Sequence, residues 1–110
     1  MAEFIKGDVV VVPFPFSDLS NTKRRPALVI TNLTGNDLIL CQITSKNVSD
    51  SYSILIKEVD FSSGSLNKIS NVRPNKLFTA DSRIILYKIG RLKEEKISEI
   101  IQSIITIIES

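Results

Sequence analysis

The segment 7–30, GDVVVVPFPFSDLSNTKRRPALVI, constrains the fold more than any other part of the chain. Its four consecutive valines, at 9–12, form an apolar β-branched run of the kind that suits a buried strand. Pro13 and Pro15 keep the backbone extended but cannot donate hydrogen bonds, so this strand should end at a sheet edge. A polar loop at 17–23 separates it from a second apolar run at 27–30. The segment therefore predicts a strand, a polar loop and a second strand.

The rest of the chain predicts a small, mainly β fold with one terminal helix. Further strands are expected at 38–45, 52–59, 69–76 and 84–92, with a Ser/Gly loop at 61–68 and a helical turn at 79–82. Alternation along the first of these puts Leu38 and Leu40 on one face and Cys41 and Ile43 on the other. Five to seven short strands with a helix suggest a small, partly open barrel on which the helix docks. A length of 110 residues predicts one domain, with the barrel at about 5–92 and the helix at about 93–109.

The tail carries isoleucines at helical spacing. They stand at positions 97, 100, 101, 104, 105 and 108, so they form one face of an amphipathic helix. Fully burying six isoleucines contributes roughly 9–18 kcal/mol of gross transfer free energy. We therefore expect this face to pack on the sheet, on a second copy of the chain, or on both.

Composition excludes several classes of site. The chain has no histidine, so it has no histidine metal ligand and no histidine acid or base. Cys41 is the single cysteine and lies in an apolar run, where a buried structural role is expected. No apolar run resembles a signal peptide or a membrane span, so we expect a cytoplasmic protein. The formal net charge of +2 is mild, but positions 68–96 hold eight cations and three anions, which suits nucleic acid or simply a solvated face.

A few side chains could carry chemistry. Arg25 precedes Pro26 at the mouth of a buried strand, Thr44 and Ser45 end another strand, and Arg73 lies beside a loop. Guanidinium groups bind phosphate through paired hydrogen bonds and can stabilise charge that develops on it. RNA supplies its own nucleophile, the 2′-OH, so such a clamp around one phosphodiester needs little else. We therefore expect Arg25 and Arg73 to close near Thr44.

The same residues carry a resemblance to a known family. The blocks GDVVVVPFPF, KRRPALVI, DLILCQITS, NVRPNKLFTAD and YKIGRL occur in that order and together resemble the MazF/PemK toxin endoribonucleases. The resemblance implies an SH3-like barrel of the MazF, Kid and CcdB type, a homodimer, no cofactor or metal, and a cognate antitoxin with an acidic, disordered tail. It also implies metal-independent, sequence-selective cleavage of single-stranded RNA by 2′-OH attack, which leaves a 2′,3′-cyclic phosphate and a 5′-OH.

The resemblance also assigns roles to residues. Arg25 matches the phosphate-binding arginine of the R-P motif, Thr44 matches a residue that contacts the scissile phosphate, and Arg73 matches an arginine that acts as general acid in some members. A surface charge, a turn cap and a solvated basic face are the respective structural alternatives. The cations and hydroxyl expected to bind RNA around them are Lys23, Arg24, Ser45, Lys46 and Lys76.

One position departs from the family pattern. Asn75 stands where many relatives have aspartate, and an amide cannot take a proton from a 2′-OH. Asp18, in the loop opposite Arg25, is the first candidate for a replacement base. Otherwise the enzyme works mainly by electrostatic stabilisation, or it is slow.

Two other functions stay open. A CcdB-like protein with this barrel inhibits DNA gyrase without enzymatic activity, although such a protein needs no phosphate clamp. A weakened paralogue would bind RNA or an antitoxin and never cut, which Asn75 makes plausible.

Overall fold

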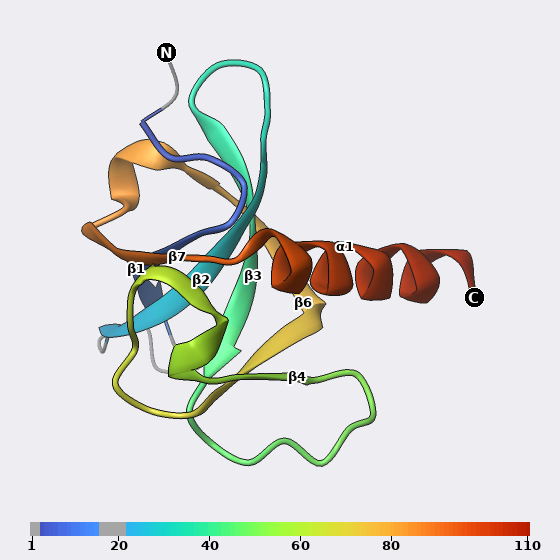
Figure 1. The fold of residues 1–110 in the computed structure, drawn as a ribbon. Helices are drawn as coiled ribbons and strands as arrows, with labels where there is room; N and C mark the ends of the chain where they lie inside the picture. The colour runs from blue at the N-terminus through green and yellow to red at the C-terminus, as the bar shows by residue number, and fades with distance from the viewer. Residues whose placement is uncertain (1–2, 16–21) are drawn as a thin grey trace.

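The protein curls one antiparallel sheet into a half-barrel and places a helix beside it (Figure 1). The structure is a computed structural model that describes residues 3–15 and 22–110, and the side chains of Phe14, Pro15 and Thr22 are outside the description. The sheet order is β4-β6-β3-β2-β1-β7-β5, and all neighbouring strands are antiparallel. The strands are β1 (Asp8–Pro15), β2 (Thr22–Asn32), β3 (Asp37–Thr44), β4 (Ile54–Ile56), β5 (Phe61–Gly64), β6 (Ser70–Asp81) and β7 (Tyr87–Leu92).

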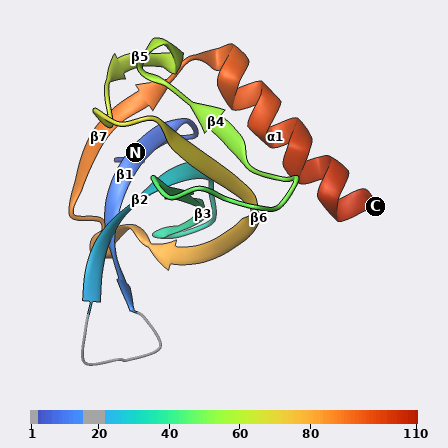
Figure 2. The same ribbon diagram turned by 90° about the horizontal axis from the view of Figure 1, so that it is seen from below.

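The two faces of the central strands belong to two separate apolar clusters. On β3, Cys41 and Ile43 join one cluster, whereas Leu38 and Leu40 join the other, which confirms the predicted alternation. On β1, Val9 lies in the first cluster, whereas Val10 and Val12 lie in the second. The sheet is strongly curled, as Figure 2 shows for β1, β2, β3, β6 and β7. Residues of α1 pack on the cluster that contains Cys41. The buried valine run at the start of the chain is therefore the centre of the fold.

A break in the pairing of β6 lies next to Cys41. Cys41 is opposite Leu77 and Gln42 is opposite Arg73, so three residues of β6, 74–76, have no partner on β3. Proline at position 74 has no N–H to give to the ladder, which suits it to such a bulge. The Cys41 thiol donates a hydrogen bond of 2.8 Å to the Arg73 carbonyl inside this bulge. Burial raises the pKa of the Cys41 thiol to about 12, so the predicted structural role of this cysteine is confirmed.

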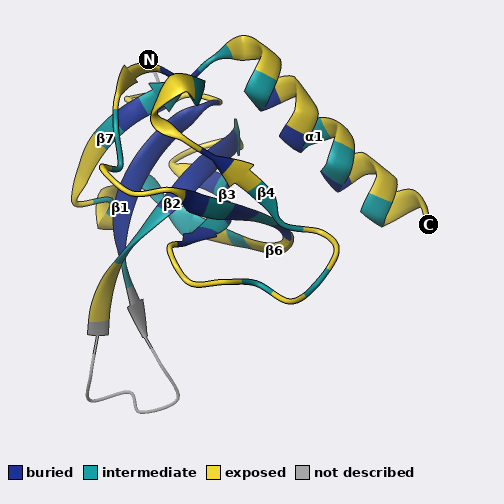
Figure 3. Ribbon diagram, turned by 60° about the horizontal axis from the view of Figure 1, so that its bottom comes forward, coloured by how far each residue is buried: buried dark blue, intermediate teal, exposed yellow. Residues whose placement is uncertain are grey.

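Helix α1 (Glu94–Glu109) covers one apolar cluster with only part of its isoleucine face. Ile97, Ile100 and Ile104 are buried, whereas Ile105 and Ile108 remain 40% and 70% exposed. Figure 3 shows the buried stripe facing the sheet and the last turns extending beyond it. Within one chain, the isoleucine face therefore packs on the sheet as expected only up to Ile104. None of the helices in the described part of the chain is long and apolar enough to span a membrane.

The Gly7-Asp8 pair at the start of β1 joins β1, β7 and the helix. Asp8 is 1% exposed, and its carboxylate accepts hydrogen bonds from the Ile5 amide at 3.0 Å and from Arg91 at 3.3 Å. Lys88 lies 3.2 Å from the same carboxylate. Gly7 has a φ of +96°, and a Cβ there would touch the end of the Ile97 side chain on α1. This corner requires glycine because L side chains rarely adopt that backbone conformation.

Several predicted boundaries were wrong. The strand expected at 52–59 is limited to β4, and a 3₁₀ turn (Glu58–Asp60) follows it. The loop expected at 61–68 begins as β5, which pairs with β7, because tertiary pairing overrides its Ser/Gly composition. Pairing with β3 likewise extends β6 from the expected 69–76 to Asp81. The helical turn expected at 79–82 therefore occupies Ser82–Ile84. The last strand begins at Tyr87 instead of Ile84.

Candidate nucleic-acid interface

Two of the predicted site residues meet at one end of the central strands. Ala27 on β2 is paired with Gln42 on β3, and continuing this antiparallel register by two residues brings Arg25 opposite Thr44. Directly opposed residues have Cβ atoms about 5 Å apart. The R-P motif and the end of the I-T-S segment are therefore neighbours on one face of the sheet.

A cleft of about 250 Å³ opens at this end of the sheet. Three cations contribute to its wall, Arg24, Arg25 and Lys68, and no carboxylate does so among the described residues that line it. The full lining is Arg24, Arg25, Pro26, Ile43, Thr44, Ser45, Leu66, Lys68 and Ser70. A positive potential over hydroxyl and guanidinium groups suits a phosphate-bearing ligand.

The cleft residues differ in how firmly they are held. Thr44 is 8% exposed, and its hydroxyl oxygen accepts a hydrogen bond of 3.2 Å from the Lys46 amide. Arg25 is half-buried, whereas Lys23, Arg24 and Lys46 are exposed. The structure thus places Thr44 and Arg25 on strands and exposes the surrounding cations to solvent.

Arg73 does not line this cleft. It is opposite Gln42 on β3, so alternation puts it on the same face as Thr44, one strand farther from Arg25. Its Nη2 atom donates a hydrogen bond of 2.9 Å to Asp50, which lies in the loop between β3 and β4. Of the three residues predicted to close on one phosphate, Arg25 and Thr44 line the same cleft, whereas Arg73 is paired with Asp50 and does not line it.

Asp50 is the residue that sequence reasoning missed. Its Oδ2 atom accepts from Arg73 and, at 3.5 Å, from Asn75, and its Oδ1 atom accepts from the amides of Tyr52 and Ser53. The hydrogen bond from Arg73 is the main cause that lowers the pKa of Asp50 below its usual value. Twenty-three residues separate Asp50 from Arg73, so no spacing rule links them. An acidic residue in the loop after the Thr44 strand was the one available signal.

The remaining predicted residues are placed as follows. Asn75 lies in the bulge of β6 and donates a hydrogen bond to Asp50 from there. Lys76, the next residue, is exposed. Ser45 lines the cleft. Asp18, the first candidate for a base, lies outside the described residues.

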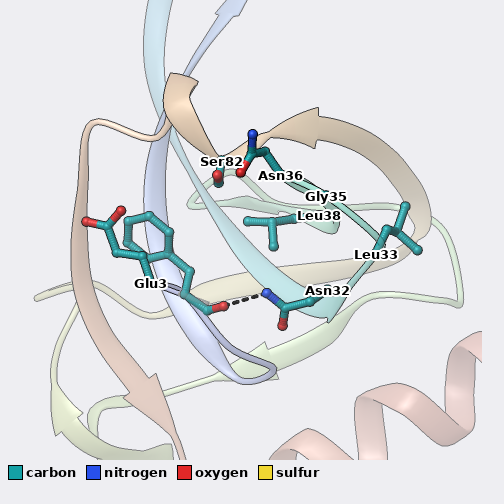
Figure 4. A pocket seen from close by; sticks show the side chains of 8 residues that line it. Glu3, Asn32, Leu33, Gly35, Asn36, Leu38 and Ser82 are labelled. Carbon is teal, nitrogen blue, oxygen red and sulfur yellow. Dashed lines mark hydrogen bonds between the residues drawn. The ribbon is translucent and has the colours of Figure 1, made fainter. Parts of the chain in front are cut away.

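A second, larger hollow lies at the opposite end of β3. It has a volume of about 360 Å³ and is lined by Glu3, Phe4, Asn32, Leu33, Gly35, Asn36, Leu38 and Ser82 (Figure 4). The Asn32 side chain crosses its floor to donate a hydrogen bond of 2.7 Å to the Phe4 carbonyl (Figure 4). No cation lines it among the described residues, and one carboxylate does. Its chemistry is therefore less suited to phosphate than that of the smaller cleft.

The comparison with protein families agrees with this geometry. Residues 5–108 match the model of the PemK-like, MazF-like toxins of type II toxin–antitoxin systems. The chain belongs to this family. The match covers both the arginine-lined cleft and most of the helix. A comparison with curated protein sequences gives no match.

Solved structures show the same fold in other MazF-type proteins. The MazF of a MazE–MazF structure from Deinococcus radiodurans matches with a TM-score of 0.77 at 16% identity, over 96% of each chain. An endoribonuclease solved with its cognate antitoxin, from a mycobacterial species, matches with a TM-score of 0.74 at 14% identity, over 96% of this chain and 95% of that one. The toxin MazF-mt6 of Mycobacterium tuberculosis gives 0.67 at 16% identity, over 91% and 96%. The curled sheet with a C-terminal helix is thus the fold of MazF toxins.

The MazF-like chain shows no obvious place for a metal ion in its described part. No group of three or more His, Cys, Asp or Glu side chains is arranged to hold one among residues 3–15 and 22–110. The guanidinium and ammonium groups that line the cleft are hydrogen-bond donors without an acceptor, so they favour an anionic ligand.

Proposed function

We propose that this MazF-like toxin is a sequence-selective endoribonuclease that cuts single-stranded RNA without a metal ion. The family match supports a toxin of a toxin–antitoxin system, and a solved relative is named an endoribonuclease. The observation that carries the finer proposal is the juxtaposition of Arg25 and Thr44 on adjacent strands at a cleft lined by three cations.

The proposed reaction needs few protein groups. The RNA 2′-oxygen attacks the adjacent phosphorus, the bond from phosphorus to the 5′-oxygen breaks, and the products are a 2′,3′-cyclic phosphate and a 5′-OH. Arg25 binds the phosphate and stabilises the charge that develops on its oxygens, and the Thr44 hydroxyl fixes its orientation. The 2′-OH gives its proton to a base, for which Asp18 is the candidate from the sequence, and the leaving 5′-oxygen takes a proton from Arg73.

The proposal includes two protein partners and a location. Relatives solved with MazE or a cognate antitoxin suggest that this chain also binds an antitoxin, whose acidic, disordered tail would fill the cationic cleft. The exposed Ile105 and Ile108 suit a contact with a second copy of the chain in a homodimer. A toxin that acts on messenger RNA works in the cytoplasm.

The decisive experiment is to incubate the purified protein with a long unstructured RNA in EDTA and to map the new ends. We expect cuts within a short recurring sequence and ends that carry a cyclic phosphate and a 5′-OH. Arg25→Ala should slow cleavage by about 100-fold or more, because one charge-stabilising contact is lost. Arg83→Ala is the matched control, since Arg83 is an exposed arginine paired with Asp81 outside the cleft.

Intact RNA at high protein concentration, in EDTA and with Mg²⁺ alike, would overturn the proposal. One observation favours a second candidate, the weakened paralogue that binds RNA without cutting. Arg73 is engaged by Asp50, and Asn75 has no basicity, so two groups expected for proton transfer are compromised. Salt-dependent RNA binding without cleavage would support that candidate, and an Asn75→Asp variant that cuts rapidly would identify the defect.

A further inference from the structure

We propose that Asp50 is a positioning residue that orients the Arg73 guanidinium toward the scissile phosphate, an inference that rests on the proposed RNA cleavage. Asp50 lies in the loop between β3 and β4, and Arg73 lies on β6. The contact therefore joins the loop that follows Thr44 to the strand next to it. It acts on the reaction through Arg73 and not by touching the reacting atoms.

The geometry is that of a bridge. One oxygen of Asp50 accepts from its own loop, at 2.9 Å from the Tyr52 amide and 3.2 Å from the Ser53 amide. The other oxygen accepts from Arg73 at 2.9 Å and from Asn75 at 3.5 Å. Since both oxygens are occupied, the carboxylate cannot rotate without breaking contacts on one side. Its orientation, and hence that of the guanidinium, is fixed from both ends.

The loop is held to β6 at a second point. Asn71, two residues before Arg73, donates a hydrogen bond of 3.2 Å to the Lys46 carbonyl at the start of the loop. Alternate residues of a strand share a face, so Asn71 and Arg73 address the loop from the same side of β6. Because Asn71 already holds the start of this loop, Asp50 is available to set the direction of Arg73.

The described residues satisfy only part of the Arg73 guanidinium. Asp50 takes an N–H of Nη2, and Nε is buried, so the N–H groups left for a ligand are those of the two Nη atoms that Asp50 does not occupy. An arginine presents five N–H groups in a rigid fork, so a carboxylate on one arm leaves others for an anion. A phosphate oxygen is the ligand that this arrangement can accept on the face that Arg73 shares with Thr44.

The contact is too open to be explained by stability. The side chains of Arg73 and Asp50 are 24% and 25% exposed, and ion pairs that water reaches contribute little to folding. A negative charge beside a phosphate site also weakens RNA binding by repulsion. Asp50 should therefore add little to the stability of the fold and should lower the affinity for RNA. Orientation of Arg73 is the contribution that remains.

The test compares Asp50→Asn with wild type in three measurements: kcat for RNA cleavage, Kd for a substrate with 2′-deoxyribose at the cut site, and the thermal midpoint. We expect kcat to fall about tenfold, since misorientation of a catalytic group is costly, while Kd is unchanged or lower. The thermal midpoint should stay at the wild-type value. Asp37→Asn is the matched control, because Asp37 is an exposed aspartate at the other end of β3.

A double-mutant cycle then isolates the link to Arg73. In an Arg73→Ala background, Asp50→Asn should have no further effect on kcat, because there is no guanidinium left to orient. An equal tenfold loss in that background would overturn the inference, and so would weaker RNA binding together with a lower thermal midpoint, which indicates loop anchoring alone. If wild type cuts RNA and Asp50→Asn cuts equally fast, only this inference fails. If wild type does not cut RNA, the proposed function fails first.

Discussion

Two aspartates in this protein each accept hydrogen bonds from an arginine and from the backbone, but they differ in their access to water. Asp8 accepts from Arg91 and from a backbone amide, and its side chain is 2% exposed. Asp50 accepts from Arg73 and from two backbone amides, and its side chain is 25% exposed. The first lies where β1, β7 and the start of α1 meet, and the second lies beside the cationic cleft.

The difference in exposure separates framework from site. A carboxylate that is taken out of water must keep its partners, because an uncompensated buried charge is strongly unfavourable. A carboxylate that water reaches keeps part of its hydration, so its ion pair contributes little to stability. Asp8 is therefore suited to hold the fold, and Asp50 is suited to orient a side chain at a site that stays open to a ligand.

The largest expected effect is on stability, at Asp8. Asp8→Ala removes a buried acceptor from Ile5 and from two cations, so we expect the free energy of unfolding to fall by about 3 kcal/mol. Asp50→Ala should change it far less. Urea unfolding followed by circular dichroism measures both variants under the same conditions.

The comparison breaks if the two alanine variants unfold at the same urea concentration. Asp8→Asn is the control for packing, since it keeps the shape of the side chain and removes only the charge. We expect it to fall between wild type and Asp8→Ala. RNA cleavage by the folded fraction of the Asp8 variants should match wild type, because this corner does not line the cleft.

The next effect is chemical and concerns Thr44, the last residue of β3 before the loop that carries Asp50. Thr44→Val keeps the volume of a nearly buried side chain and removes a hydroxyl that now accepts from the Lys46 amide. We expect cleavage to slow by about tenfold with a small loss of stability, since one hydrogen bond to an exposed loop is lost. Single-turnover cleavage of a short RNA measures this rate, and Thr44→Ser should restore most of it. Equal rates for Thr44→Val and wild type would remove Thr44 from the site.

Much of this fold could be predicted because its signals are local. The valine run before Pro13, the alternation around Cys41 and the isoleucine spacing of the tail each identify an element without reference to the rest of the chain. The errors lie where pairing between distant segments decides. Phe61–Gly64 is a strand because β7 lies beside it, and β6 passes Pro74 because a bulge absorbs the proline.

The site divides in the same way. Thr44 ends a predicted strand, and Arg25 precedes the apolar run predicted as another, although β2 itself begins earlier, at Thr22. Both residues line one cleft because β2 and β3 are paired. The partner of Arg73 was not predictable, because Asp50 lies in a loop whose path depends on contacts with β6 through Asn71 and Asn75. This loop holds a single carboxylate, but nothing in the sequence indicates that the loop folds back onto β6.

The smallest expected effect sharpens the comparison with a third contact, between Asp81 and Arg83. Arg83 is 78% exposed, and its hydrogen bonds lower the pKa of Asp81 from an ordinary 3.8 to about 2. A lowered carboxyl pKa stabilises the fold above its ordinary value, and this contribution disappears as the pH falls from about 4 toward 2. Asp81→Asn should therefore lower the urea midpoint slightly at pH 7, by an amount that shrinks to zero near pH 2. Added salt should reduce the difference at pH 7, because solvent-exposed charges are screened. A difference as large as that of Asp8→Ala would show that exposure does not rank these three contacts.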